Sequence, residues 1–428
     1  MGLKTVLKDT PIQHAYWKIR NLYPVRRVRK KLGSMHRDKI LYHVYPEHYD
    51  KFKTAPVDEN KVLFIEMRIA EMGNSFTYLY NMLSEQYNFD IHVHFLRETF
   101  VPRKEHEKRC LAMLEDLATA KYVFVSEASD VLSCITMRPE TVMVQLWHAC
   151  GAFKKFGMST ADKIFGRTRE GMLRHPFYKN YTFVSVSSPE VRWAYAQAMS
   201  LEDQMDTIVA DGTSRTDIFF DKDAIALAYE HVYEKFPAAR GKKIILFAPT
   251  FRGRIATART AEGFDLEKFA QAFRGEYVVI TKHHPIAREL PQIPADLNGS
   301  FAYDATSTLS IEDLLMASDI CISDYSSLIF EFSLFERPML FYAYDLEDYF
   351  DWRGFYYPYE EMTPGPICRT NEEMIDWIRH KDTKFDRQQV VDFRKKFMAS
   401  CDGHATERIL KRAMGEEVLK AHQKTRKV

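Results

Sequence analysis

Short apolar runs that alternate with amphipathic segments are the feature that most restricts how this chain can fold. One series of such runs begins at residue 61 and a second begins near Gly241. Runs of this kind, separated by helix-like stretches, are typical of parallel sheets with helices on both faces. The pattern predicts strands at residues 63–68, 90–96, 121–126, 141–148, 181–187 and 206–212 in the first series, and at 242–250, 277–285, 318–326 and 337–345 in the second.

The two series predict two doubly wound α/β domains that face each other across a cleft. We expect the first domain at residues 61–240 and the second at residues 241–428, with the charged stretch 221–241 as the connection. Residues 1–60 are expected to form a basic, helical extension. Ligands of doubly wound sheets bind at the carboxyl ends of the strands, so polar residues at these ends are the candidates for chemistry.

The composition agrees with an ordinary globular protein, with 46% hydrophobic and 28% charged residues. No apolar run reaches the roughly 18 residues that a membrane-spanning helix needs, and no secretory signal is recognisable. The cysteines are scattered without a CxxC pair, which favours reduced thiols in a cytoplasm over disulfides or a zinc site. They are Cys110, Cys134, Cys150, Cys321, Cys368 and Cys401.

Positive charge is concentrated at the N-terminus. Residues 1–40 contain eleven Lys and Arg against two Asp, a net charge of +9, whereas the remaining residues carry −8. In the stretch WKIRNLYPVRRVRKKLG the basic residues alternate with aromatic and aliphatic ones, which favours docking on an anionic membrane surface. No basic stripe continues through the rest of the chain, so nucleic acid is not an expected partner. A solvated basic tail is the alternative, because Pro24 divides the segment into two short pieces.

The run DICISDYSSLIFEF is the most informative strand end. An apolar strand stops at Ser323-Asp324, and a helix begins at Ser326-Ser327. Hydroxyl groups at a helix start either cap the free backbone amides or, together with these amides, bind an oxyanion. Glu331 lies four residues after Ser327 on the same helix face, where it would accept hydrogen bonds from ribose hydroxyls or be solvated.

Two further strand ends carry charged or titratable groups. ILFAPTFRG ends in Thr250 and Arg252, and a guanidinium at a strand end suits a diphosphate, although a surface arginine is the alternative. TKHHP ends in two histidines, of which one should face the cleft because neighbours on a strand alternate faces. We select His284 for the cleft because it precedes Pro285.

The string QLWHACG places His148 where an apolar run ends. The local residues leave three roles open, namely a metal ligand with Cys150, a general base, or a core histidine. Zinc is disfavoured because no second Cys/His pair accompanies the string. No metal site is predicted elsewhere, since Asp345 and Asp348 fit a turn and a helix start equally well. Mg²⁺ in solution would help to neutralise a charged substrate, but no bound cofactor is expected.

Several strings together resemble one family. They occur in the order LWHACGAFKKFG, DGTSRTDIFF, ILFAPTFRG, KHHP, ISDYSSLIFEFSLFERPMLFYAYDLEDY, RGFYY and PGPI. This set closely resembles the CDP-glycerol glycerophosphotransferase family, which includes teichoic acid primases and polymerases. The resemblance covers roughly residues 60–410. It implies the GT-B type of fold, in which two Rossmann-like domains face a cleft.

The resemblance also implies roles for individual residues. The two histidines associated with catalysis in the family fall on His148 and His284. The residues implied for binding of the CDP donor are Thr250, Arg252, Asp324, Ser326, Ser327 and Glu331. On the acceptor side stand Gly151, Lys154, Lys155 and Arg215. The family's usual WHG-type string is WHAC here, with the glycine at position 151.

The implied reaction is the transfer of glycerol phosphate from CDP-glycerol to a hydroxyl of a lipid-linked wall teichoic acid or capsule-type precursor, with release of CMP. His148 would act as the general base, and His284 with the Ser326-Ser327 helix start would stabilise the phosphoryl charge. Members of the family resemble peripheral membrane enzymes, so we expect a cytoplasmic protein at the inner face of the membrane, and a homo-oligomer is one further expectation. The alternatives are transfer of ribitol phosphate from CDP-ribitol, a GT-B nucleotide-sugar glycosyltransferase, and a scaffold without enzymatic activity.

Overall fold

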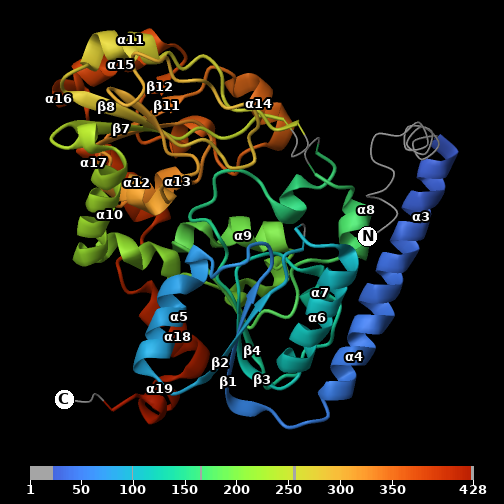
Figure 1. Cartoon of the computed structure of the whole chain (residues 1–428). Coiled ribbons are helices and arrows are strands. Elements are labelled where there is room, and N and C mark those ends of the chain that lie inside the picture. Colours follow the sequence, from blue (N-terminus) through green and yellow to red (C-terminus); the bar gives the residue numbers. More distant parts are fainter. Residues whose placement is uncertain (1–22, 99, 164–165, 254–256, 426–428) are drawn as a thin grey trace, which may run out of the picture.

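The chain forms two α/β halves, each built around a parallel sheet of six strands (Figure 1). The structure is a computed structural model that describes residues 23–98, 100–163, 166–253 and 257–425. The first sheet contains β1 (Asp58–Glu66), β2 (Asp90–Phe95), β3 (Ala120–Val125), β4 (Val142–Gln145), β5 (Phe183–Ser185) and β6 (Ile208–Val209). The second contains β7 (Lys243–Phe247), β8 (Tyr277–Thr281), β9 (Ala302–Asp304), β10 (Ile320–Ser323), β11 (Met339–Tyr342) and β12 (Ile367–Cys368).

Each sheet reverses its strand order at one point, which is where ligands bind in folds of this kind. The first sheet has the order β2-β1-β3-β4-β5-β6, so the reversal lies between β1 and β3. The second has the order β12-β11-β10-β7-β8-β9, and its reversal lies between β7 and β10. The predicted class, two doubly wound α/β sheets, is confirmed.

The strands predicted from the apolar runs are all present, but β9 and β12 were not predicted. Both are edge strands of the second sheet and have the sequences AYD and IC. Segments this short contain too few residues to show an alternating or apolar pattern. Only pairing with a longer neighbour identifies them as strands.

The first sheet is covered on both faces, which explains the continuous apolar run in β1. Val62 and Phe64 belong to one buried cluster, which also contains residues of α5 (Asn74–Gln86). Leu63 and Ile65 point the other way, into a cluster with α6 (Arg103–Leu117). Successive residues therefore pack against opposite layers of helices.

The described part of the N-terminal extension is helical, with α3 (Tyr23–Lys39), a π-helical segment (Ile40–Val44) and α4 (Tyr45–Phe52) lying along the first half (Figure 1). Pro24 is the second residue of the described part of α3. Tyr45 and Tyr49 are buried beside α6. Residues 1–22 lie outside the described residues. No helix in the described ranges is long and apolar enough to cross a membrane.

The C-terminal segment returns to the first sheet after the second is complete. Helices α18 (Ala405–Met414) and α19 (Glu416–His422) lie beside α5 (Figure 1). Ile409, Leu410 and Met414 share a buried cluster with Val62 and Phe64 of β1. The C-terminal segment thus packs against the first half of the chain, although it follows the second half in sequence. The expected domain division between residues 240 and 241 stays a prediction.

The remaining main helices are α8 (Arg169–Arg174), α9 (Arg192–Met199), α10 (Lys222–Lys235), α11 (Leu266–Phe273), α12 (Ile311–Ala317), α13 (Leu328–Ser333), α14 (Leu346–Arg353), α15 (Asn371–Arg379) and α17 (Arg387–Phe397). Of these, α12 and α13 carry polar residues toward the first half of the chain, as described next.

Candidate active site

The ends of β7 and β10 are tied together by hydrogen bonds to one carboxylate. The Thr250 backbone N–H donates to Asp324 Oδ1 over 2.8 Å, and Thr250 Oγ1 donates to Oδ2 over 3.1 Å. The backbone N–H of Tyr325 also donates to Asp324. Asp324 is 1% exposed. Its buried carboxylate therefore holds together the ends of β7 and β10, the two strands between which the strand order of the second sheet reverses.

Arg252 completes this arrangement by donating to two carboxylates. Its Nη1 donates to Asp324 Oδ2 over 2.9 Å, and its Nε and Nη2 donate to Asp345. The guanidinium also lies over the rings of Tyr325 and Tyr349, at 5.1 Å from each centroid. Arg252 therefore positions the strand ends, and Asp345 has a function as its counter-ion.

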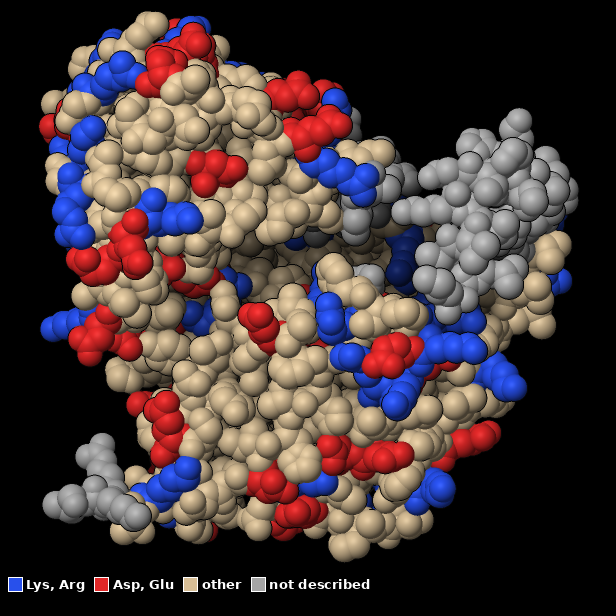
Figure 2. All heavy atoms as spheres, in the orientation of Figure 1, with Lys and Arg blue, Asp and Glu red and all other residues tan. Residues whose placement is uncertain are grey.

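Two adjoining hollows lie where the halves meet, in the recess between them that Figure 2 shows. The first has a volume of about 380 Å³ and the second about 290 Å³. Their lining includes most of the site residues expected from the sequence. Those that line both are His148, Thr250, His284, Ser326 and Ser327; Arg215 and Glu331 line the first only, Gly151 and Lys154 line the second only, and Arg252, Asp324 and Lys155 line neither.

Gly151 is required by the close approach of the two halves. Its φ of +61° lies in the left-handed region, and an added Cβ would stand 2.3 Å from the ring of Phe330 in α13. Lys154, three residues later, donates from Nζ to the Tyr349 hydroxyl over 3.2 Å. Lys155 lies against the second half through its backbone N–H, which donates to Gly354, and burial together with Lys163 lowers the pKa of its side chain.

A buried arginine joins the halves at the first hollow. Arg215 Nη2 donates to Glu312 Oε1 over 2.9 Å, and Arg215 Nη1 donates to the backbone carbonyl of His148 over 2.6 Å. Asn74 also donates to Glu312 Oε1, over 2.7 Å. Glu312 and Asn74 were not predicted as site residues; Asn74 is the first residue of α5, and Glu312 is the second residue of α12.

Glu331 is a buried carboxylate with one oxygen that lacks a partner. Its Oε1 lies 3.8 Å from Arg215 Nε, whereas Oε2 has no hydrogen bond within the part of the chain described. Burial raises the pKa of Glu331, and the charge of Arg215 opposes the rise. A buried oxygen without a donor costs about 1–3 kcal/mol, so a ligand hydroxyl at this position would gain by satisfying it.

His148 leaves the first sheet at an unusual turn. Strand β4 ends at Gln145, and Trp147 has a φ of +56°, which a bulky residue adopts only where its surroundings impose it. The Gln145 side chain imposes it here by accepting the Trp147 backbone N–H over 2.9 Å. The His148 side chain is 45% exposed as a result, and its Nδ1 lies 3.3 Å from the Ser126 carbonyl and 3.2 Å from Glu127 Oε1.

The two histidines at the end of β8 differ in environment. His283 is 4% exposed and its Nδ1 lies 2.6 Å from Thr260 Oγ1, inside the second half. His284 lines both hollows, and its Nδ1 accepts the backbone N–H of Ile286 over 3.2 Å. Burial lowers the pKa of His284, and the positive charge of Lys154 lowers it further. A neutral ring with Nδ1 as acceptor carries its proton on Nε2, which is then a donor.

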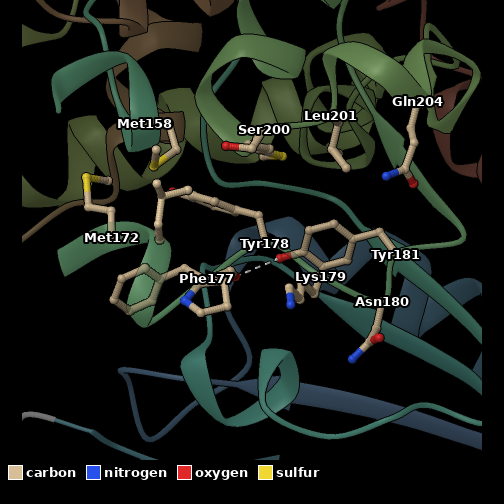
Figure 3. Close-up of a pocket in the computed structure, with 13 residues that line it drawn as sticks. Met158, Met172, Phe177, Tyr178, Lys179, Asn180, Tyr181, Ser200, Leu201 and Gln204 are labelled. Carbon is tan, nitrogen blue, oxygen red and sulfur yellow. Dashed lines mark hydrogen bonds between the residues drawn. The ribbon is translucent and has the colours of Figure 1, made fainter. Parts of the chain in front are cut away.

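A further hollow of about 480 Å³ lies in the first half, and no histidine lines it (Figure 3). It is lined largely by apolar and aromatic side chains, among them Met158, Met172, Phe177 and Leu201. The only charged residue in this lining is Lys179, and the lining contains neither a carboxylate nor a histidine. The two adjoining hollows differ from it because they contain His148 and His284.

Over the described ranges no group of three or more His, Cys, Asp or Glu side chains is arranged to hold a metal ion. The polar atoms that line the two hollows are instead imidazoles, hydroxyls, carboxylates in contact with Arg215, and lysines. Such a set can accept a proton, donate hydrogen bonds to phosphoryl oxygens and bind the hydroxyls of a ribose.

Comparisons with known proteins agree with this chemistry. A sequence profile of the family described as CDP-Glycerol:Poly(glycerophosphate) glycerophosphotransferase matches residues 47–415. The chain is 34% identical over 361 residues to the teichoic acid ribitol-phosphate primase of Bacillus spizizenii, which covers 83% of this chain and 90% of the primase. It is also 34% identical over 365 residues to the teichoic acid poly(ribitol-phosphate) polymerase of the same organism, covering 85% of this chain but only 57% of that relative.

The fold is also similar to a solved structure. The wall teichoic acid polymerase TagF aligns with a TM-score of 0.70 and 19% identity, over 93% of this chain and 98% of the TagF chain. At this identity the similarity concerns the fold alone. It supports the predicted arrangement of two Rossmann-like halves.

The raised pKa of Glu331 predicts a pH-dependent cost to stability. The unfolded carboxyl group titrates near its ordinary pKa of 4.5, whereas the folded protein binds the proton more tightly. The free energy of unfolding of the wild type, relative to that of Glu331→Gln, should therefore fall as the pH rises from 4.5 toward neutrality, by about 1.4 kcal/mol for each unit of the shift.

Urea unfolding of both proteins across this pH range measures the difference. Glu417→Gln, at an exposed position of α19, is the matched control, and its difference from the wild type should not depend on pH in this way. A wild-type minus Glu331→Gln difference that stays constant would contradict the raised pKa.

Proposed function

Because the chain belongs to the CDP-glycerol:poly(glycerophosphate) glycerophosphotransferase family, we propose that it transfers an alditol phosphate from a CDP-alditol to a hydroxyl of a lipid-linked wall teichoic acid or capsule-type precursor, releasing CMP. The observation that carries the proposal is the shared lining of the two hollows. His148 comes from the first half, and His284 with Ser326 comes from the second. A donor held by the second half would thus meet an acceptor presented by the first.

In this reaction the acceptor oxygen attacks the β-phosphorus of the donor, and the bond from that phosphorus to CMP breaks. The hydroxyl proton goes to His148. An imidazole suits this task because it changes protonation near neutral pH. Since little covalent work falls to the protein in phosphoryl transfer, positioning and charge stabilisation supply most of the rate enhancement.

The second half would stabilise the charge on the transferred group and the departing CMP. His284 would donate from Nε2 to a phosphoryl oxygen, and the hydroxyls of Ser326 and Ser327 would donate beside it. Glu331 Oε2 would accept a hydrogen bond from a ribose hydroxyl of the cytidine. This role is supported by the lack of a hydrogen-bond partner for Oε2 among the described residues. Arg252 contributes by holding the strand ends that carry these groups.

Two donors are candidates for the alditol. The description of the family names glycerol phosphate, which makes CDP-glycerol the first candidate. The primase and the polymerase of Bacillus spizizenii, at 34% identity, carry ribitol phosphate in their names, which makes CDP-ribitol the second candidate. A nucleotide-sugar glycosyltransferase is the alternative from a different reaction class.

A donor panel tests the reaction class. We expect release of CMP from CDP-glycerol or CDP-ribitol in the presence of a lipid-linked disaccharide acceptor, with and without a primer phosphate, and no turnover of UDP-sugars. Product length then distinguishes addition of one unit from polymerisation. Transfer of a sugar from a UDP-sugar, with both CDP-alditols inert, would overturn the proposal.

Replacement of the histidines tests the roles of the individual groups. His148→Ala should lower kcat for CMP release by about 10²- to 10⁴-fold through loss of the general base. His284→Ala should lower it by about 10²- to 10³-fold through loss of a donor to the phosphoryl group. His404→Ala, which alters a histidine in neither hollow, is the control and should retain wild-type kcat. Wild-type rates in both site variants would refute the mechanism.

The same proposal places the protein on the anionic cytoplasmic face of a membrane through residues 1–40. In α3, Val28, Leu32 and Met35 are each more than half exposed between basic residues. Lys and Arg side chains also gather over α6 and α7 (Asp130–Ser133) on the face that Figure 2 shows. These features support a surface that combines positive charge with apolar contacts.

Removal of residues 1–40 should weaken binding to vesicles that contain anionic lipid. Screening reduces attraction between exposed charges, so the loss should be larger at low than at high salt. Sedimentation of the intact and shortened proteins with anionic and with neutral vesicles measures it. Equal binding of both proteins at low salt would exclude residues 1–40 as the anchor.

A further inference from the structure

Glu127 is a carboxylate that the family motifs do not include, and it lies beside the proposed base. It follows β3, two residues after the end of that strand, whereas His148 follows β4, the adjacent strand. Glu127 Oε1 stands 3.2 Å from His148 Nδ1, and the Glu127 side chain is 12% exposed. The pair therefore forms at the carboxyl ends of two neighbouring strands.

The surroundings of Nδ1 determine where the imidazole carries its proton. Nδ1 faces two acceptors, the Ser126 carbonyl at 3.3 Å and the Glu127 carboxylate. A ring nitrogen that donates to an acceptor carries hydrogen, and in a neutral imidazole the other nitrogen then has the lone pair. The arrangement thus makes Nε2 the nitrogen that can accept a proton.

We propose that Glu127 is a positioning residue for His148: its carboxylate accepts a hydrogen bond from Nδ1–H, holds the ring with Nε2 as the base, and compensates the positive charge that forms when Nε2 takes the acceptor's proton. The proposal rests on the proposed function, in which His148 is the base. At the Glu127–His148 pair, the only covalent bond that changes is the N–H bond that forms at Nε2 of His148. The acceptor hydroxyl loses its proton to Nε2, and Nδ1 keeps its own.

One buried side chain fixes the spacing between the two partners. Gln145 is 0% exposed, and its Nε2 donates to the Glu127 backbone carbonyl over 3.1 Å. Its Oε1 accepts the backbone N–H of Trp147, the neighbour of His148. The loops after β3 and β4 are thereby held in one register. Such support is what a precisely placed base requires, because small displacements cost large factors in rate.

The far oxygen of Glu127 also has a partner. Glu127 Oε2 lies 3.3 Å from Arg68 Nη2, in the loop after β1. Burial raises the pKa of Glu127, and the charge of Arg68 opposes that rise. Arg68 thus favours the charged carboxylate that the proposal needs, and it contacts the oxygen that does not face His148.

Other ionisable groups near the pair come from several elements. Glu66 at the end of β1 is close enough for Glu127 to raise its pKa, although burial is the larger cause. Tyr178 and Tyr181 approach from the segment before β5, and burial raises the pKa of each above its ordinary value. On the cleft side, Arg215 donates to the His148 backbone carbonyl, and His284 lines the same hollows. Arg68 is the cation that contacts the carboxylate itself.

The test compares Glu127→Gln and Glu127→Ala with Glu71→Gln, which makes the same change of charge at an exposed position of the β1–α5 loop. In the full chain, kcat for CMP release should fall about 10- to 100-fold in Glu127→Ala, with KM for the donor nearly unchanged. Loss of the carboxylate disfavours the imidazolium, so the acidic limb of the pH profile of kcat should move to lower pH by about one unit in both Glu127 variants.

Two further measurements separate this proposal from its premise and from misfolding. The midpoint of the His148 ring titration, followed by NMR and assigned through His148→Ala, should fall in Glu127→Gln but not in Glu71→Gln. Urea unfolding should show that Glu127→Gln is folded under assay conditions. An unchanged ring titration together with an unchanged acidic limb would overturn the role of Glu127. Full activity in His148→Ala would instead refute the base assignment, whatever the Glu127 variants show.

Discussion

The arrangement of the site depends on the buried ion pair between Arg215 and Glu312. Arg215 follows the last strand of the first sheet, and Glu312 begins a helix of the second half, so this contact crosses the boundary between them. The same guanidinium donates to the backbone carbonyl of His148. Removing one partner from a buried pair leaves an uncompensated charge and costs about 3–5 kcal/mol, so the relative position of the halves is strongly restrained here.

The close approach that this contact requires explains other features of the boundary. Gly151 has no side chain because Phe330 occupies the space where a Cβ would lie. Lys154 contacts Tyr349 of the second half, and rings from both halves meet where Phe153 packs edge-on against Phe330 and Phe355. The loop after His148 is therefore shaped on one side by its own sheet and on the other by α13. A base on such a loop is placed relative to both substrates at once.

Charges in this protein divide into those that build the site and those that face it. Asp324 and Arg252 belong to the first group, because their hydrogen bonds are made within the chain and neither lines the two adjoining hollows. Glu331 belongs to the second, since one of its buried oxygens has no partner in the described structure. Residue type and motif position could not show which charged residues build the site and which face it. An arginine at a strand end, for example, is equally suited to a phosphate and to two nearby carboxylates.

Sequence pattern by itself determined the class of fold and the strand ends where polar groups gather, because buried parallel strands must be apolar and their carboxyl ends must lie at one edge of the sheet. It also identified His148, His284 and Ser326 as candidates. The tertiary structure decided which of the candidates share a hollow and supplied partners that no local pattern could show. Glu127 and Glu312 are examples, because each gains its partner from a segment distant in sequence, at 21 positions from His148 and 97 from Arg215. Distances and burial between such segments are set by packing of the whole chain, which local periodicity does not encode.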